Sequence, residues 1–218
     1  MNLITIDGPS ASGKGTVSHL VAQHLGWEVL DSGALYRICA YAVLEYGLNA
    51  DDEQAVAAVI PDLVIRFDVD RVYVNDQEVS EQLRLEHIGK LASKVAAYPA
   101  VRQALLDLQR SFLTDKGLVG DGRDMGTVIF PQAPLKIFLI ADVNERAKRR
   151  YKQLVEKGID ADFEAILLDL QKRDEQDMNR AVAPLKPADD AIVIDSSYMG
   201  IQAVVDRILG HWEQVRVK

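Results

Sequence analysis

The stretch Gly8-Pro9-Ser10-Ala11-Ser12-Gly13-Lys14-Gly15-Thr16 decides how the rest of this 218-residue chain is interpreted. It contains the spacing Gly-x-x-x-x-Gly-Lys, which is typical of a phosphate-binding loop. Backbone N–H groups of such a loop can all point toward a polyphosphate, because glycine tolerates unusual dihedral angles and carries no side chain. A helix that starts at Lys14 adds its positive N-terminal end, and the lysine can reach the β- and γ-phosphates. All nine residues are therefore candidates for binding a nucleotide triphosphate.

The segments around this loop predict alternating strands and helices. Residues 2–7 form a short apolar run rich in β-branched residues, as in a strand buried within a parallel sheet. After the loop, apolar residues recur at helical spacing until Gly26. A second strand is expected at 27–30, a turn at 31–33 and a helix at 34–46. This order predicts an α/β architecture.

The pattern changes near Pro61 and later returns. Apolar runs at 63–67 and 71–74 flank Asp68-Val69-Asp70, which favours a small antiparallel meander. A largely helical stretch is expected at about 80–114, so residues 61–110 are interpreted as an insertion beside the main sheet. The α/β pattern then resumes, with strands expected at 117–121, 135–140 and 191–195 and helices at 143–157 and 162–180. A final helix is expected to bury one apolar face, which consists of Ile201, Val204, Val205, Ile208, Leu209 and Trp212.

Composition narrows the functional classes. The hydrophobic fraction is 48% and the charged fraction 27%, as in globular proteins. A net charge of −8 argues against binding nucleic acid or an anionic membrane. The single cysteine, Cys39, and the absence of a targeting or membrane-spanning segment favour a soluble protein of the cytoplasm. The four histidines show no metal-ligand spacing.

One position departs from the usual phosphate-loop pattern. Gly15 follows Lys14, so the hydroxyl group that commonly binds Mg²⁺ arrives one residue later, at Thr16. The ending Gly-Lys-Gly-Thr resembles nucleoside monophosphate kinases more than GTPases, and the chain has no Asn-Lys-x-Asp motif for reading guanine.

Two further segments should lie at the carboxyl edge of the sheet, where ligands of open α/β sheets bind. In Asp31–Arg37, Ser32 can donate a hydrogen bond and Arg37 can grip a phosphate, although a helix cap with a surface arginine is an equal interpretation. In Gly120–Gly126, Asp121 is the candidate ligand for Mg²⁺ or its water, and Arg123 and Asp124 could meet a nucleotide. The alternative there is a tight turn held by Asp and Gly.

A cluster of basic residues precedes Gly158. It consists of Arg146, Lys148, Arg149, Arg150 and Lys152. Most such clusters are solvated helix faces. A mobile lid over residues 148–170, with its tip at 158–160, is the sharper hypothesis, since arginines that close over a transferring phosphoryl group stabilise its charge. Arg149 and Arg150 are then candidates for binding ATP.

Taken together, the phosphate loop, Asp31–Arg37, Asp121–Thr127 and the run Arg173–Pro184 resemble the bacterial cytidylate kinase family over nearly the whole chain. The resemblance implies a P-loop fold with a five-stranded parallel sheet and flanking helices in residues 1–60 and 111–218, an inserted α+β subdomain for the monophosphate in 61–110, and a helical lid. It implies a monomer that uses ATP, Mg²⁺ and CMP or dCMP in pyrimidine nucleotide metabolism. The implied roles are cytosine recognition by Ser93, Arg102 and Asp124, phosphate binding by Arg37 and Arg123, sugar and phosphate contacts by Arg173 and Asp177, and support by Arg180.

Phosphoryl transfer from ATP to CMP is accordingly the expected activity, with Lys14, Arg123 and Arg173 as catalytic residues. Two alternatives stay open. The acceptor could be AMP, UMP or a small hydroxylated metabolite, or the chain could be a nucleotide-gated regulator that binds ATP without acceptor-dependent turnover.

Overall fold

The computed structural model describes residues 1–68 and 71–217, which divide into two compact units. Unit 1 comprises Met1–Leu30 together with Phe112–Lys218, and unit 2 is Asp31–Ser111. Unit 2 therefore includes the predicted insertion 61–110 together with the segment that precedes it. Of the expected turn Asp68-Val69-Asp70, residues 69 and 70 lie outside the described part of the chain.

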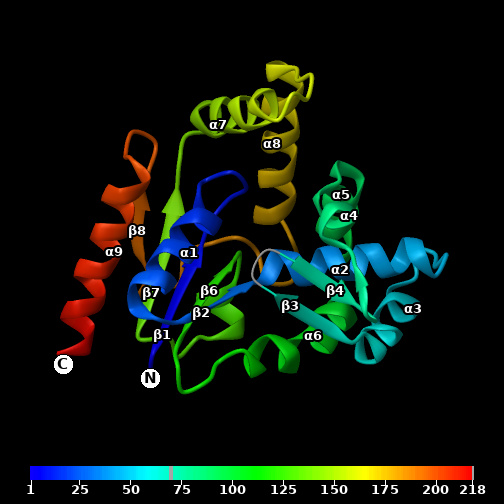
Figure 1. The fold of residues 1–218 in the computed structure, drawn as a ribbon, viewed down its shortest axis with the longest axis horizontal. Helices are drawn as coiled ribbons and strands as arrows, with labels where there is room; N and C mark the ends of the chain where they lie inside the picture. The colour runs from blue at the N-terminus through cyan, green and yellow to red at the C-terminus, as the bar shows by residue number, and fades with distance from the viewer. Residues whose placement is uncertain (69–70, 218) are drawn as a thin grey trace. The chain divides into compact units, whose positions relative to one another are not determined.

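Unit 1 is built on a five-stranded sheet, as predicted (Figure 1). Its strand order is β2 (Glu28–Asp31), β6 (Leu118–Gly122), β1 (Leu3–Asp7), β7 (Leu135–Ile140) and β8 (Ile192–Asp195). β1 lies in the centre and pairs in parallel with both β6 and β7, and β7 pairs in parallel with β8. All five residues of β1 are buried, which explains why its sequence is a continuous apolar run rather than an alternating one.

Two helices share one hydrophobic core with this sheet, namely α1 (Lys14–Leu25) and α9 (Ile201–Arg216). α1 ends at Gly26, whose φ of 70° is the left-handed conformation that glycine adopts readily. The predicted apolar face of α9 is confirmed for Val204, Val205, Ile208 and Trp212, which are all buried. The prediction is wrong for Ile201, which is exposed because it is the first residue of the helix.

The two tryptophans of the chain meet in unit 1. The rings of Trp27 and Trp212 pack edge to face, with their centroids 4.9 Å apart. Gly117 lies against the same indole, because a Cβ atom at this position would come within 2.6 Å of the Trp27 ring. Its φ of 102° also excludes most other residues.

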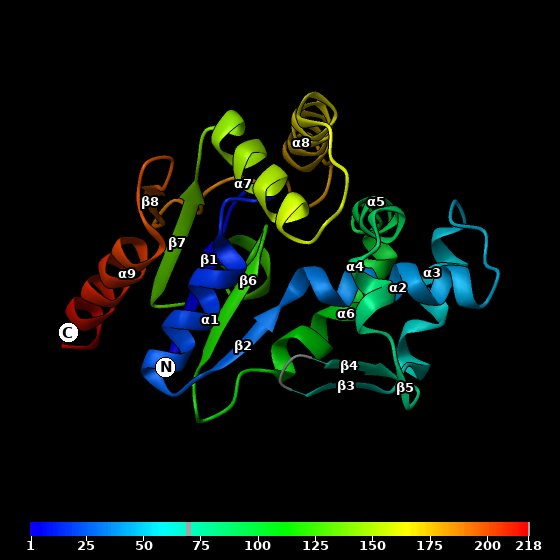
Figure 2. The same cartoon turned by 45° about the horizontal axis from the view of Figure 1, so that its top comes forward.

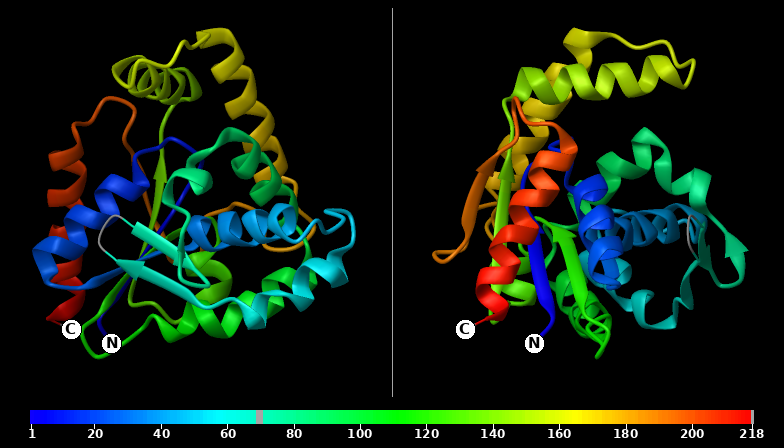
Figure 3. Two further views of the ribbon diagram at one scale, coloured as in Figure 1. Left: turned by 45° about the vertical axis from the view of Figure 1, so that its right-hand side comes forward. Right: turned by 60° about the vertical axis from the view of Figure 1, so that its left-hand side comes forward.

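Two further helices of unit 1, α7 (Val143–Glu156) and α8 (Phe163–Met178), pack against each other. α7 begins beyond the carboxyl end of β7, and α8 runs back from it (Figure 3). Each starts at an aspartate that accepts hydrogen bonds from N–H groups of its first turn, Asp142 for α7 and Asp162 for α8. A single turn of π-helix, Met125–Ile129, lies between β6 and β7.

Unit 2 combines helices with a small antiparallel sheet (Figure 2). The sheet has the order β3 (Ile65–Asp68), β4 (Arg71–Val74) and β5 (Gln77–Glu78), which confirms the predicted meander. The helices are α2 (Ser32–Glu45), α3 (Glu53–Ala58), the short 3₁₀ turn Ile60–Asp62, α4 (Ser80–Arg84), α5 (Glu86–Val95) and α6 (Pro99–Ser111).

The predicted turn at Asp31-Ser32-Gly33 is wrong. Asp31 is the last residue of β2 and at the same time the N-cap of α2, which begins at Ser32. Its carboxylate accepts a hydrogen bond from the N–H of Ala34 at 3.1 Å. An aspartate followed by a small polar residue is a pattern that turns and helix caps share, so local sequence could not separate them.

Within the described residues, no helix combines the length and the apolar character that crossing a membrane requires.

Candidate functional site

The phosphate loop joins β1 to α1 and is shaped by residues with unusual backbone angles. Gly8 has a φ of 154°, and a Cβ atom there would lie 2.1 Å from the carbonyl oxygen of Leu139. Ala11 and Gly13 have φ values of 58° and 93°, both in the left-handed region. Left-handed residues interrupt regular pairing and turn successive N–H groups toward one concave side. The loop therefore has the geometry that its glycine spacing predicts.

Lys14 is the first residue of α1 and is almost completely buried. Its Nζ atom donates a hydrogen bond to the carbonyl oxygen of Pro9 at 2.8 Å. The side chain thus folds back along the loop, which places a positive charge beside the N–H groups at the start of the helix. Both features favour an anionic ligand at this position.

Two arginines of α7 hold the loop from its carbonyl side. Nη1 of Arg146 donates to the carbonyl oxygen of Ser10 at 3.0 Å, and Nη1 of Arg149 donates to that of Ser12 at 3.4 Å. Arg149 also donates to the carbonyl oxygens of Ser196 and Ser197, which follow β8. Arg150 is exposed on the same helix. In this structure Arg149 is engaged with main-chain oxygens, and ATP contacts by Arg149 and Arg150 stay a prediction.

Sequence reasoning missed the buried ion pair between Arg146 and Asp174. The two side chains form a bidentate ion pair between α7 and α8. Nη1 of Arg146 donates to Oδ1 of Asp174 at 3.1 Å, and Nη2 donates to Oδ2. By sequence Arg146 belongs to the basic cluster of its helix, but its side chain is only 5% exposed. The two residues lie far apart in sequence, and no spacing rule links them.

Asp7 is a second residue that sequence reasoning did not single out. It ends β1, and its two carboxylate oxygens accept hydrogen bonds from the N–H groups of Met125 and Gly126, both at 2.8 Å. Burial raises the pKa of Asp7 to about 7, against the lowering effect of these two hydrogen bonds. The contact ties the segment after β6, which carries several candidate residues, to the strand that leads into the phosphate loop. A polar residue at the end of an apolar strand was the available signal.

Asp121 lies on β6 next to the phosphate loop. It is buried, and a Cβ atom built on Gly15 would lie 3.6 Å from its Oδ2 atom. Thr16, the other candidate metal ligand, is exposed on the first turn of α1. Among the described residues no group of three or more histidine, cysteine or acidic side chains could hold a metal ion. One carboxylate and one hydroxyl group suit Mg²⁺ that keeps several waters and is bound mainly through phosphates.

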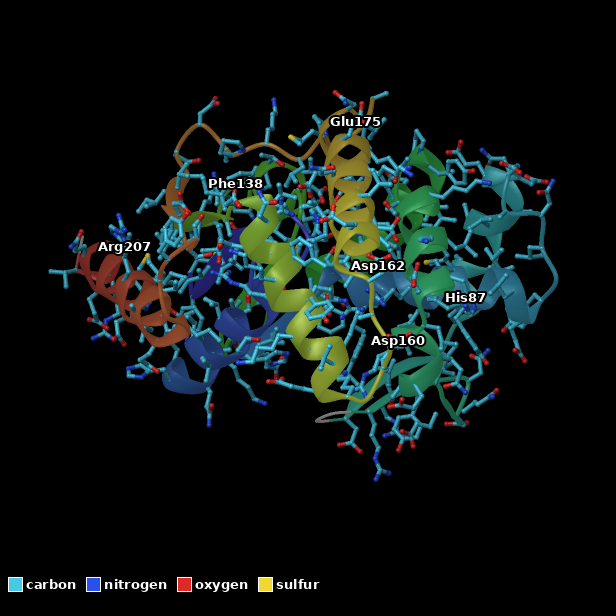
Figure 4. All side chains as sticks on the ribbon, turned by 90° about the horizontal axis from the view of Figure 1, so that it is seen from above. His87, Phe138, Asp160, Asp162, Glu175 and Arg207 are labelled. Carbon is cyan, nitrogen blue, oxygen red and sulfur yellow. The ribbon has the colours of Figure 1, made fainter. Side chains whose placement is uncertain are left out.

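Several of the predicted acceptor residues meet in unit 1. Nε of Arg123 donates to Oδ2 of Asp177 at 2.8 Å, and Nη2 of Arg123 donates to Oγ of Ser10, also at 2.8 Å. Arg180 lies against the same aspartate, with Nη2 3.9 Å from Oδ1. Asp177 is buried on α8, and the half-buried Arg173 lies one turn earlier on that helix. Figure 4 looks onto α8 and onto the connection from α7, where Asp160 and Asp162 are labelled.

The remaining acceptor residues belong to unit 2. Arg37 on α2 donates to the carbonyl oxygen of Leu83 at 2.7 Å, and its guanidinium group lies beside Gly89, where a Cβ atom would be 3.7 Å away. Arg102 on α6 is buried and donates to the hydroxyl group of Tyr36 at 3.1 Å. Oγ of Ser32 accepts a hydrogen bond from Gln109 at 3.0 Å.

Ser93 and Asp124 differ in how their polar atoms are satisfied. Oγ of Ser93, on α5, is buried and makes no hydrogen bond within the residues that the structure describes. A buried hydroxyl group without a partner is costly, and sites that bind polar ligands often contain one. Asp124 is almost fully buried in unit 1 and precedes the π-helical turn, and its carbonyl oxygen accepts a hydrogen bond from the N–H group of Val128.

Comparison with known proteins gives one consistent family. The sequence model of the family described as "Cytidylate kinase" matches residues 4–214. A cytidylate kinase of Bordetella bronchiseptica is 58% identical over 210 residues, which cover 96% of this chain and 94% of the relative. One of Saccharophagus degradans is 58% identical over 213 residues, with 95% of each chain covered. Among solved structures, an uncharacterized protein from Eubacterium ventriosum covers 97% of this chain with a TM-score of 0.52 and 12% identity, which concerns the fold alone.

Proposed function

Since the chain belongs to the cytidylate kinase family, we propose that it transfers the γ-phosphoryl group of ATP to CMP or dCMP, giving ADP and CDP or dCDP. The structural observation that carries this proposal is the phosphate loop between β1 and α1, with Lys14 buried at its centre and Asp121 beside Gly15. Loops of this shape bind nucleotide triphosphates through main-chain N–H groups. The loop accounts for the triphosphate donor, and membership of the cytidylate kinase family supports a cytidine monophosphate as the acceptor.

On the donor side, residues Gly8 to Thr16 bind the phosphates of ATP in this proposal, and Arg149 and Arg150 add positive charge from α7. The two left-handed residues, Ala11 and Gly13, and the buried Lys14 support it. Mg²⁺ would be held by Asp121, by Thr16 and by the phosphates of ATP, and would neutralise part of their charge. The buried carboxylate beside Gly15 fits that role.

On the acceptor side, the residues proposed to bind CMP lie partly in unit 1 and partly in unit 2. Unit 1 supplies Arg123, Asp124, Arg173, Asp177 and Arg180, and unit 2 supplies Ser32, Arg37, Ser93 and Arg102. Two features support the assignment in unit 2. Ser93 has a buried Oγ atom without a hydrogen bond among the described residues, and Arg102 is a buried cation that donates to the hydroxyl group of Tyr36 and to the carbonyl oxygen of Ala96. Both could hydrogen-bond the polar edge of a base.

The proposed chemistry needs no covalent intermediate with the protein. An oxygen of the CMP phosphate attacks the γ-phosphorus atom in line with the bond to the leaving ADP. This oxygen is already ionised, so no strong general base is required. Lys14, Arg123 and Arg173 lower the barrier by holding the phosphates together and by stabilising charge as it moves.

A panel of acceptors tests the function. Purified protein is mixed with ATP, Mg²⁺ and one of CMP, dCMP, UMP, AMP or GMP, and ADP is measured by a coupled assay. We expect ADP formation that depends on CMP and dCMP and far exceeds that with the other acceptors. A preference for AMP, UMP or another acceptor would replace the proposed substrate, and ATP binding without any acceptor-dependent turnover would favour a regulator.

The Lys14→Ala variant is the matched control for the chemistry. It should keep the fold but lose nearly all CMP-dependent turnover. The ammonium group that stabilises the negative charge of the phosphoryl group during transfer is missing from this variant. Circular dichroism checks the fold, and full activity of this variant would refute the assigned role.

A further inference from the structure

Ser10 of the phosphate loop is held at two atoms by two different arginines. Its hydroxyl oxygen accepts a hydrogen bond from Nη2 of Arg123 at 2.8 Å, and its carbonyl oxygen accepts one from Nη1 of Arg146 at 3.0 Å. Ser10 itself is 8% exposed; its contact with Arg146 is buried and its contact with Arg123 is partly buried. Hydrogen bonds with an ionised donor are among the stronger ones in proteins. One loop residue is therefore fixed on two sides by positive groups.

Each of these arginines is anchored by a carboxylate of α8. Asp174 binds Arg146 and Asp177 binds Arg123. The two aspartates are three residues apart and both buried, so they lie on the same inner face of the helix. Two aspartates of α8 thus reach Ser10, each through one arginine: Asp174 through Arg146, and Asp177 through Arg123.

Under the proposed function, Arg146 and Arg123 have different roles. Arg146 donates to the carbonyl oxygens of Ala141 and Ser10 and to the carboxylate of Asp174, which is a structural role. Arg123 is a proposed ligand of the acceptor phosphate. Three of its N–H groups donate, to Asp177, to Gly122 and to Ser10, so the plane of its guanidinium group is fixed before a ligand arrives.

We propose that the hydroxyl group of Ser10 is a positioning group for the acceptor side: it orients Arg123 toward CMP and does not serve as a ligand of ATP. This inference rests on the proposed function, in which Arg123 binds the acceptor phosphate. The main chain of Ser10 belongs to the donor loop, while its side chain acts on the other substrate. A preorganised arginine binds its phosphate without a further loss of side-chain freedom.

The Ser10→Ala variant separates the two roles. If the hydroxyl group positions Arg123, the KM for CMP should rise about tenfold, the usual scale for one hydrogen bond to a charged group. The KM for ATP should change by less than about twofold, since the main-chain contacts of the loop are kept. Ser10→Cys is a second, nearly isosteric variant with a poor hydrogen-bond acceptor, and it should show the same split.

Ser18→Ala is the matched control. Ser18 is a fully buried serine of α1, and its Oγ atom makes no hydrogen bond among the described residues. Its substitution should leave both KM values unchanged. Thermal melting of all variants confirms that each is folded.

A double-mutant cycle gives the decisive readout. In the Arg123→Ala background, Ser10→Ala should have no further effect on CMP affinity measured by calorimetry, because the positioned group is gone. An equal loss of CMP affinity in both backgrounds, an increase mainly in the KM for ATP, or no change in either KM would overturn the inference. These outcomes are read only from a wild-type protein that turns over CMP, so failure of the proposed function would be recognised separately.

Discussion

At the scale of single residues, Asp7 should make the stability of the protein depend on pH. Its pKa is raised from 3.8 to about 7 by burial. Between these values the folded state binds more protons than the unfolded state, so this group's contribution to the free energy of unfolding falls as the pH rises. Asp7→Asn removes that contribution, and the variant should lose less stability than the wild type between about pH 5 and pH 7.

Urea unfolding at several pH values, followed by tryptophan fluorescence, measures this difference. Both tryptophans lie in unit 1, as Asp7 does. Asp190→Asn is the control. The pKa of Asp190 is lowered by its hydrogen bond with Lys136, so its contribution changes only in more acidic solution and its curve should run parallel to that of the wild type. A parallel curve for Asp7→Asn as well would show that Asp7 does not titrate in this range.

At the scale of elements, the connection from β1 to α1 should tolerate no side chain at its first position. Gly8→Ala would push a Cβ atom to within 2.1 Å of a main-chain oxygen of β7, at a φ that other residues rarely adopt. We expect a loss of at least about 2 kcal/mol in the free energy of unfolding. The main chain of β7 cannot yield without disturbing its pairing with β1 and β8.

Gly210→Ala in α9 should have the opposite effect on stability to Gly8→Ala. A Cβ atom there meets nothing within 4 Å, and the residue lies inside a helix. The change should stabilise the protein by about 0.5–1 kcal/mol, because alanine loses less backbone entropy than glycine. Chemical denaturation of both variants tests the pair, and similar stability changes in the two would contradict the argument from space and φ.

At the scale of the whole molecule, the connection between α7 and α8 should become protected when both substrates bind. Lys157, Gly158 and Ile159 are exposed in this connection, which is the tip of the proposed lid. If the lid closes over the phosphates, trypsin should cleave after Lys157 several times more slowly with CMP and a non-hydrolysable ATP analogue than without ligands.

Lys116 supplies the internal control for this proteolysis. It is an exposed lysine just before β6, outside the proposed lid, and its cleavage rate should not depend on ligands. Mass spectrometry of the fragments follows both sites in one sample. An unchanged rate at Lys157 with both ligands bound would contradict lid closure. The expected monomeric state is tested separately by light scattering.

The site is only partly visible in the sequence. The phosphate loop could be located because its glycines, its lysine and its flanking elements are contiguous, and local rules govern them. The buried pair Arg146–Asp174 and the contact from Arg123 to Ser10 could not be located, since they join residues that are far apart in the chain. The basic residues of α7 look alike in sequence, yet Arg146 is buried, Arg149 is half-buried, and Lys148, Arg150 and Lys152 are exposed.

Hydrophobic periodicity and the glycine pattern by themselves determined the alternation of strands and helices, the antiparallel meander and the position of the nucleotide loop. These features depend on neighbours within a few residues. Only the tertiary structure decided the strand order, which places β1 between β6 and β7, and the partners of Asp7, Asp174 and Asp177. The physical reason is that burial of a charge is tolerated only where distant segments bring it a partner, and packing, not local sequence, selects those segments.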